Sequence, residues 1–270
     1  MEETLNHTSP PFKEIIDLIE TLRGENGCPW DRKQTPLSMT RYLVEEAFEL
    51  MDAVHSENVE DICEELGDVL FLVLFIAIQF QSSGQFNIKT LTQRNLDKMT
   101  RRHPHVFAEE TAHTPEKVRE RWHEIKRQEK SSQPDHTVLG TVPKSLPALM
   151  RAHRISERAA HTGFDWDNIE GVMIKAQEEW EELKQELKKD LEDAGNREAL
   201  ELEIGDVLFT LVNVARFAGI HPETALAAST RKFETRFNSM EKLAKSRQTL
   251  FEKLSYSDKH RLWDEVKRGE

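Results

Sequence analysis

The chain of 270 residues is poor in cysteine, in long apolar runs and in positive charge. Its two cysteines, Cys28 and Cys63, are too few for a disulfide framework and indicate reduced thiols in a cytoplasmic protein. The longest apolar run, Val69 to Ile78, is ten residues. A membrane span needs about 20, so this run predicts a buried helix. The formal charge of −12 argues against a nucleic-acid surface or an anionic-membrane surface, because both need a basic face.

Several enzyme motifs are also missing. The sequence has no glycine-rich phosphate loop, no HExxH zinc motif, no nucleophile elbow and no paired CxxC. Because no nucleophilic side chain stands out, we expect hydrolysis to use a metal-bound water. An acidic chain can still bind a phosphate ligand that arrives with such an ion.

Apolar residues recur at helical spacing along most of the chain, and no strand-like alternation is long enough to predict a sheet. The pattern predicts an all-α protein. The expected helices cover residues 12–22, 36–55, 58–82, 87–102, 115–130, 150–160, 168–191 and 197–217, and two more begin at 222 and 257. A shift in composition marks 131–146 as a linker between domains 1–130 and 147–270.

One acidic stretch organises the sequence, because it occurs twice. The segment Glu65 to Phe71 reads ELGDVLF, and Glu203 to Phe209 reads EIGDVLF. Carboxylates three residues apart lie on one face of a helix. A glycine costs a helix about 1 kcal/mol relative to alanine, so we expect a close backbone approach at Gly67 and Gly205.

Three further motifs repeat in the same order, and the length differences fall in the expected loops. Such matched order indicates a duplicated domain. The matched pairs are Glu46/Glu49 with Glu179/Glu182, Lys98/Arg102 with Lys232/Arg236, and Trp122/Lys126 with Trp263/Lys267.

The repeated carboxylates can converge if the two acidic helices of one half pack face to face. Such a cluster is costly unless it is protonated or neutralised by a cation. Oxygen ligands suit Mg²⁺ or Mn²⁺ better than zinc. Any one acidic pair alone is better explained as a solvated helix face, but the matched set favours a metal site. The lysine–arginine pairs could clamp phosphates or be solvated basic stripes, and the tryptophans could stack on a ligand or lie in the core.

These motifs resemble the MazG family of nucleoside triphosphate pyrophosphohydrolases, in its two-domain form. The resemblance runs from about Phe12 to Glu270, and the joint ExxE and ExxD spacing with Lys-x-x-x-Arg downstream is its specific part. The segments Gly27 to Asp31, Arg101 to Phe107 and Gly163 to Trp166 also carry it.

The resemblance implies an all-α fold of two tandem helical-bundle repeats and a homodimer with its active site at the dimer interface. It implies Mg²⁺-dependent hydrolysis of ribo- or deoxynucleoside triphosphates to the monophosphate and diphosphate. A role in nucleotide-pool housekeeping or stress would follow.

The resemblance also implies roles for individual residues, with the second repeat as the catalytic one. The expected metal ligands and catalytic residues are Glu179, Glu182, Glu203 and Asp206. The expected nucleotide contacts are Lys175, Lys232, Arg236, Trp263 and Lys267. A candidate second site in the first repeat comprises Glu46, Glu49, Glu65, Asp68, Lys98, Arg102, Trp122 and Lys126. Where the family can carry a lysine four residues before the ExxD glutamate, this chain has Ala199.

Alternatives remain for the function and for the first repeat. A non-catalytic helical adaptor could use the same helices to bind a nucleotide or a partner. A di-iron bundle would need two Glu-x-x-His motifs on facing helices, for which Glu110/His113 and Glu120/His123 are the candidates. The first repeat could be catalytic, regulatory or a dimerisation module. Because Val69 to Ile78 is apolar all round, we expect this repeat to form the more deeply buried subunit contact.

Overall fold

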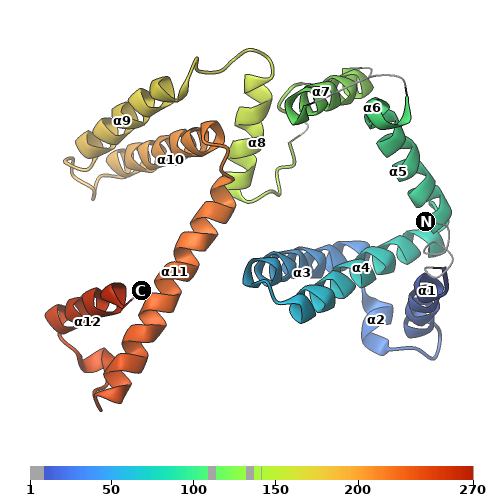
Figure 1. The fold of residues 1–270 in the computed structure, drawn as a ribbon, viewed down its shortest axis with the longest axis horizontal. Coiled ribbons are helices and arrows are strands. Elements are labelled where there is room, and N and C mark those ends of the chain that lie inside the picture. The colour runs from blue at the N-terminus through green and yellow to red at the C-terminus, as the bar shows by residue number, and fades with distance from the viewer. Residues whose placement is uncertain (1–8, 109–113, 132–136, 141, 270) are drawn as a thin grey trace. The chain divides into compact units, whose positions relative to one another are not determined.

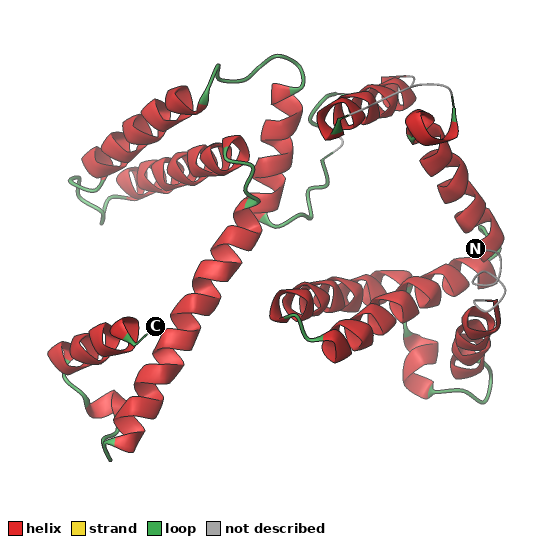
Figure 2. Cartoon of the chain, viewed as in Figure 1, coloured by secondary structure: helices red, strands yellow, loops and turns green. Residues whose placement is uncertain are grey.

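The computed structural model describes residues 9–108, 114–131, 137–140 and 142–269. These residues form α-helices and one short 3₁₀-helix, without a strand (Figure 2). The all-α fold predicted from the sequence is confirmed. The chain divides into two compact units, Met1–Lys130 (unit 1) and Ser131–Glu270 (unit 2). Within the expected linker, residues 132–136 and 141 lie outside the described part of the chain.

Unit 1 is built around a helical hairpin. Its helices are α1 (Ser9–Arg23), α2 (Pro29–Lys33), α3 (Pro36–Ser56), α4 (Val59–Ser82), α5 (Ile88–Arg102), α6 (Pro104–Phe107) and α7 (Pro115–Ser131). Helices α3 and α4 pack side by side, and α1 packs on α4 (Figure 1). Glu57 closes the hairpin in the left-handed conformation, with φ 58°.

Unit 2 repeats the hairpin and adds a long helix. Its helices are α8 (Ala148–Ala160), α9 (Ile169–Glu186), α10 (Ala194–Phe217), α11 (Pro222–Ser246), η1 (Phe251–Lys253) and α12 (Tyr256–Arg268). Helices α9 and α10 form the hairpin, and α8 packs on α10 and α11. Helix α12 packs on the second half of α11 through Met240, Ala244 and Leu262 (Figure 1).

Polar side chains at the loop ends set where the four hairpin helices begin. The hydroxyl of Thr35 accepts a hydrogen bond from the Ser38 amide at the start of α3, and Asn58 accepts one from Glu60 at the start of α4. In unit 2, Asn168 and Asp193 cap α9 and α10 in the same way. Each cap satisfies an amide that the helix leaves free and contributes about 1 kcal/mol. The caps therefore fix the register of the acidic residues that follow.

The apolar stretch of α4 is buried inside unit 1. Phe75 is fully buried among Ile19 of α1 and Met39 of α3. The apolar character that predicted a subunit contact at Val69 to Ile78 is thus largely satisfied by α1 and α3 of the same unit.

The corresponding position of α10 is polar. Asn213 is 1% exposed, donates a hydrogen bond to the Phe209 carbonyl oxygen (3.1 Å) and accepts one from Arg216 Nη2 (3.2 Å). Arg216 in turn pairs with Asp165 from the loop before α9, at 2.5 Å. Hydrogen bonds offset the cost of burying these groups. Unit 2 therefore has a partly polar interior where that of unit 1 is apolar.

Two details differ from the helices expected from sequence. Helix α9 ends at Glu186 rather than near residue 191, because Asp190 starts a turn: its carboxylate accepts from the Glu192 amide and its carbonyl oxygen from Asn196. The short helices α2 and α6 follow Cys28 and His103, in segments expected to be loops. In the described residues no single helix is long and apolar enough to cross a membrane; α10 and α11 meet that criterion only together, across a bend of 103°.

Candidate functional site

Each unit gathers three glutamates between the two helices of its hairpin. In unit 2, Glu179 and Glu182 of α9 meet Glu203 of α10, and one carboxylate oxygen of each lies within 4.8 Å of the other two. We call these residues the C-terminal acidic cluster. In unit 1, Glu46 and Glu49 of α3 meet Glu65 of α4 in the same way, and form the N-terminal acidic cluster. The structure thus brings together three of the four carboxylates that the sequence predicted for each site.

The fourth carboxylate of each site stands apart. Asp206 and Asp68 lie one helical turn beyond Glu203 and Glu65, are exposed, and are not part of the two groups of converging oxygens. Their charges still act on the clusters. Asp206 contributes to a raised pKa of Glu203, and Asp68 does the same for Glu65.

The glycines between these residues do not serve close packing. A Cβ atom built on Gly67 or Gly205 would meet nothing within 4 Å. The expected close backbone approach is therefore wrong for the described chain, since both glycines face open space. No contact within either unit explains why glycine stands there.

The clusters hold their negative charge at a cost. Partial burial raises the pKa of Glu203, and the neighbouring charges of Glu182 and Asp206 raise it further. Burial and neighbouring carboxylates raise the pKa of Glu46 and Glu65 in the same direction. A cation between the oxygens would relieve both effects.

One oxygen at each site lacks a partner. Oε2 of Glu203 and Oε2 of Glu65 are buried and accept no hydrogen bond. The two residues occupy equivalent positions in the repeats. An oxygen-only donor set with a buried free oxygen fits a hard cation such as Mg²⁺ or Mn²⁺.

Lys175 distinguishes the C-terminal acidic cluster from its counterpart. Its Nζ lies 2.8 Å from Glu179 Oε1 and 3.0 Å from Glu178 Oε1. The hydrogen bonds that the lysine donates to Glu179 and Glu178 raise its pKa. The equivalent residue of unit 1 is Tyr42, whose ring meets Trp30 edge-on with centroids 5.7 Å apart. The spacing of Lys175 to both glutamates predicts an ion pair, although the resemblance assigned this lysine to the nucleotide.

The arginines and tryptophans singled out in the sequence meet in both units. Arg236 of α11 lies 5.6 Å from the ring centroid of Trp263 of α12, and Arg102 of α5 lies 5.3 Å from that of Trp122 of α7. These distances suit cation–π contacts. Arg102 also binds Glu129, with Nη2 to Oε2 at 2.5 Å.

Within each unit these contacts lie away from the acidic hairpin. Helix α12 lies along the second half of α11, apart from α9 and α10, and α5 leads away from the α3–α4 pair (Figure 1). The remaining predicted lysines are on the same helices: Lys98 on α5, Lys126 on α7, Lys232 on α11 and Lys267 on α12. Ala199 lies on α10, one turn before Glu203. Apart from Lys175, the predicted basic residues of each unit therefore lie on other helices than its acidic hairpin.

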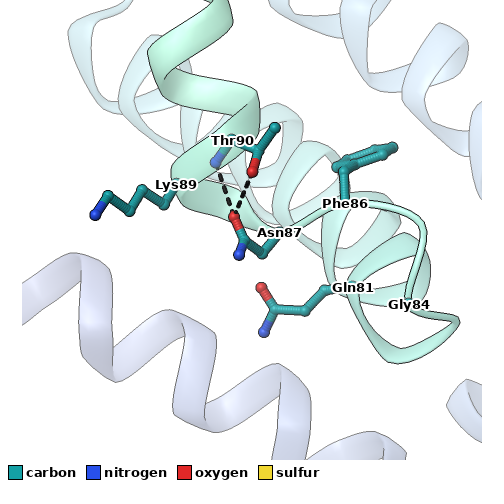
Figure 3. A pocket seen from close by; sticks show the side chains of 6 residues that line it. All are labelled: Gln81, Gly84, Phe86, Asn87, Lys89 and Thr90. Carbon is teal, nitrogen blue, oxygen red and sulfur yellow. Dashed lines mark hydrogen bonds between the residues drawn. The ribbon is translucent and has the colours of Figure 1, made fainter.

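A separate hollow opens at the turn between α4 and α5. It measures about 580 Å³ and is lined by Gln81, Gly84, Phe86, Asn87, Lys89 and Thr90 (Figure 3). Asn87 caps α5 there by accepting hydrogen bonds from the amide and hydroxyl of Thr90. None of the predicted site residues lines this hollow.

The residues of the di-iron alternative cannot be compared with the clusters. Glu110 and His113, and the side chains of Glu120 and His123, lie outside the described residues. Both acidic clusters consist of glutamate only.

Comparison with protein families finds one model that matches the chain twice. The MazG nucleotide pyrophosphohydrolase domain matches residues 34–107 and 168–240. The matched ranges contain both acidic clusters and both lysine–arginine pairs. Trp122, Lys126, Trp263 and Lys267 lie beyond them.

Individual proteins match nearly the whole chain. A nucleoside triphosphate pyrophosphohydrolase of Escherichia coli (strain K12) is 39% identical over 257 residues, which cover 95% of this chain and 97% of that protein. A nucleoside triphosphate pyrophosphohydrolase/pyrophosphatase MazG of Thermotoga maritima is 39% identical over 259 residues, 96% of each chain. A crystal structure of a mazG-related protein from Thermotoga maritima covers 43% of this chain and 98% of its own, at 28% identity and a TM-score of 0.37.

Proposed function

The chain belongs to the MazG nucleotide pyrophosphohydrolase family, and from this premise we propose that it is an enzyme that hydrolyses ribo- or deoxynucleoside triphosphates to the monophosphate and diphosphate. The observation that carries the proposal is the C-terminal acidic cluster with its unpartnered Glu203 oxygen. Such a cluster is unfavourable by itself and becomes favourable around a cation. Nucleoside triphosphates are commonly bound together with Mg²⁺.

We assign Mg²⁺, or Mn²⁺, to Glu179, Glu182 and Glu203, with Asp206 as a fourth ligand. A divalent ion bound there supplies Lewis acidity and offsets the charge of the phosphates. Glu179 is only 6% exposed, so its carboxylate is held in place by the helices around it. Attack of water at the α-phosphate would give the proposed products.

The cationic residues bind and orient the phosphates. Arg236 presents a planar guanidinium that its contact with Trp263 holds in place, and such a group can bind two phosphate oxygens at once. Lys232, one turn earlier on α11, and Lys267 on α12 add positive charge beside it. Charge that develops on the departing oxygens would be stabilised by these groups.

We also propose that the protein is a homodimer. Apolar side chains on one face of α10 are exposed, namely Ile204 (44%), Leu208 (48%) and Leu211 (51%). Large apolar patches usually mark an interaction surface. A second copy on this face would exclude water from the acidic cluster and could bring basic groups to it. Sedimentation at micromolar concentration should give twice the mass of one chain, and a monodisperse monomer would refute the dimer.

For unit 1 we propose a site that binds the cation or the nucleotide without being the principal catalytic site. It keeps Glu46, Glu49 and Glu65 in the same arrangement, but has Tyr42 in place of Lys175.

Both cysteines of the chain, Cys28 and Cys63, are free thiols, which suits the proposed cytoplasmic location.

The test of the activity is a product assay with each of the common ribo- and deoxynucleoside triphosphates in the presence of Mg²⁺. We expect equal amounts of monophosphate and diphosphate, and no turnover after chelation of the metal. Absence of products from every substrate would refute the activity, and formation of nucleoside diphosphate and phosphate would refute the bond assigned.

A nucleotide-binding adaptor is the second candidate, because the predicted basic residues other than Lys175 lie on other helices than the acidic hairpin. It predicts no turnover with any triphosphate. A nonhydrolysable triphosphate with Mg²⁺ should raise the unfolding temperature for either candidate, so the product assay separates them. Release of monophosphate and diphosphate that is lost in Glu203→Gln supports the enzyme.

A further inference from the structure

The two acidic clusters have the same glutamates but different neighbours one turn earlier. Lys175 precedes Glu179 by four residues, and Tyr42 precedes Glu46 by four residues. Residues four apart on a helix lie side by side. The two clusters of this chain can therefore be compared directly, because one has a lysine beside it and the other does not.

In unit 2 the ammonium group of Lys175 already forms an ion pair with a residue of the cluster. Lys175 Nζ is 2.8 Å from Glu179, whose side chain is 8% exposed, while the lysine side chain is 36% exposed. The lysine thus covers the solvent side of a carboxylate that a metal ion would use. An ammonium in this position competes with a bare divalent ion, since both use the same carboxylate.

In unit 1 the cluster has no such counter-ion. Within the described part of unit 1, Glu46, Glu49 and Glu65 form no ion pair with a basic side chain. Oε2 of Glu65 is buried and unpartnered, and Tyr42 is turned to Trp30. A cation that neutralises this cluster therefore has to come from outside the described part of unit 1.

We propose that the two clusters bind divalent cations in different states. The N-terminal acidic cluster binds the bare ion. The C-terminal acidic cluster binds the ion together with a polyphosphate, whose oxygens give Lys175 a new partner when it leaves Glu179. The second statement rests on the proposed function, whereas the first does not.

The expected difference in affinity follows from charge. An ammonium a few ångströms from a divalent ion in a solvated site weakens binding by about tenfold. The N-terminal acidic cluster therefore binds a metal ion at concentrations at which the C-terminal acidic cluster has none and keeps its ion pair with Lys175. Unit 1 thus binds its metal ion without nucleotide, and unit 2 binds its metal ion together with the substrate.

The test uses the full chain and Mn²⁺, with free Mn²⁺ followed by electron paramagnetic resonance in the absence of nucleotide. We expect one tighter class of one ion per chain. Glu65→Gln should remove this class, and Glu203→Gln should leave it. Lys175→Met should tighten the second class about tenfold, and Tyr42→Lys should weaken the first by a similar factor.

A matched control is available on α9. Lys184 forms an ion pair with Glu181, Nζ to Oε1 2.9 Å, outside the cluster. Lys184→Met removes the same charge from the same helix and should not change Mn²⁺ binding. An equal effect of the two lysine variants would overturn the proposal, because it would reflect net charge rather than the contact with Glu179.

Other results also contradict the proposal: two equal classes in the wild type, no bare-ion binding, or loss of the tighter class in Glu203→Gln. A nonhydrolysable triphosphate should bring a second ion into the wild type but not into Glu203→Gln. The product assay separates the two claims. If products form but Mn²⁺ does not bind the N-terminal acidic cluster more tightly than the C-terminal one, this inference alone is refuted. If Mn²⁺ binds with that difference in affinity but no products form, the proposed function alone is refuted.

Discussion

Unit 1 and unit 2 support the same three glutamates on differently built hairpins. Phe75 of α4 and Asn213 of α10 are equivalent and both almost fully buried, at 0% and 1% exposed. Phe75 packs in an apolar core, whereas Asn213 belongs to a hydrogen-bonded chain with Arg216 and Asp165. Burial of polar groups contributes less to stability than burial of apolar ones. The difference indicates that the hairpin of unit 1 is the more stable one, while that of unit 2 contains buried polar groups.

The largest expected difference between the units is in activity. Glu203→Gln removes a charge at the metal site of unit 2 and should lower kcat at least about 100-fold, the usual effect of losing one group that stabilises the transition state. Glu65→Gln makes the same change in unit 1 and should keep most of the activity. Product formation with Mg²⁺ measures both, and helical circular dichroism checks folding. If Glu65→Gln were the inactive variant, the catalytic unit would be misassigned.

The next difference is in stability. Phe75→Ala leaves a cavity in a closed apolar core and should reduce the free energy of unfolding of unit 1 by about 3–5 kcal/mol. Asn213→Ala removes hydrogen bonds instead and should cost unit 2 about 1–3 kcal/mol. Denaturant unfolding of the full chain, with tryptophan fluorescence for each unit, measures both. Equal losses would contradict the contrast between the two cores.

A smaller effect concerns pH and the ion pair of Arg102 with Glu129 in unit 1. Hydrogen bonds from Arg102 and then Arg101 lower the pKa of Glu129, outweighing the opposite effect of burial. The folded pKa is below the unfolded value of about 4.3, so the stabilisation is present above that value. It is lost as pH falls through the folded pKa. Glu129→Gln should therefore cost about 1 kcal/mol at pH 7, and the difference from wild type should vanish once the pH has fallen below the lowered folded pKa of Glu129.

The pH profile of that variant also has a control. Glu124→Gln removes a carboxylate from an exposed ion pair with Arg121 on the same helix. Exposed pairs of this kind contribute little, so its unfolding profile should follow the wild type. A Glu129→Gln penalty that persisted at acid pH would show that packing, not charge, is responsible.

The smallest expected effect is at the two helix glycines. Gly67→Ala and Gly205→Ala place a methyl group in open space, so each should stabilise its own unit by up to about 1 kcal/mol. A loss of stability or of the dimer in Gly205→Ala alone would show that a second chain covers that face of α10. Thermal unfolding combined with sedimentation distinguishes the two outcomes.

Much of the fold could be predicted from sequence, because the signals are local. Thr35-Pro36 and Asn58 mark helix starts through capping, and the structure begins α3 and α4 there. The i, i+3 spacing of Glu46 and Glu49 predicts a shared face, and the short turn at Glu57 folds α4 back against it. Convergence with Glu65 follows from these two facts.

The remaining details depend on tertiary contacts. The spacing of Glu203 and Asp206 suggests that both reach the cluster, but the structure gathers only Glu203 with the α9 pair. The occurrence of glycine in both copies of the motif predicted close packing at Gly205, yet a Cβ atom there would meet nothing within 4 Å in the described chain. Arg236 lies on α11 and not on the acidic hairpin, and its position relative to the hairpin depends on the direction in which α11 leaves α10, which residue spacing does not specify.

The claim that the chain cleaves the bond between the α- and β-phosphates is tested most directly by hydrolysis in ¹⁸O-labelled water. The triphosphate with the highest turnover is used, and the products are analysed by ³¹P NMR and mass spectrometry. We predict one labelled oxygen in the nucleoside monophosphate and none in the diphosphate. Label in the diphosphate, or release of labelled inorganic phosphate as the primary product, would contradict the account.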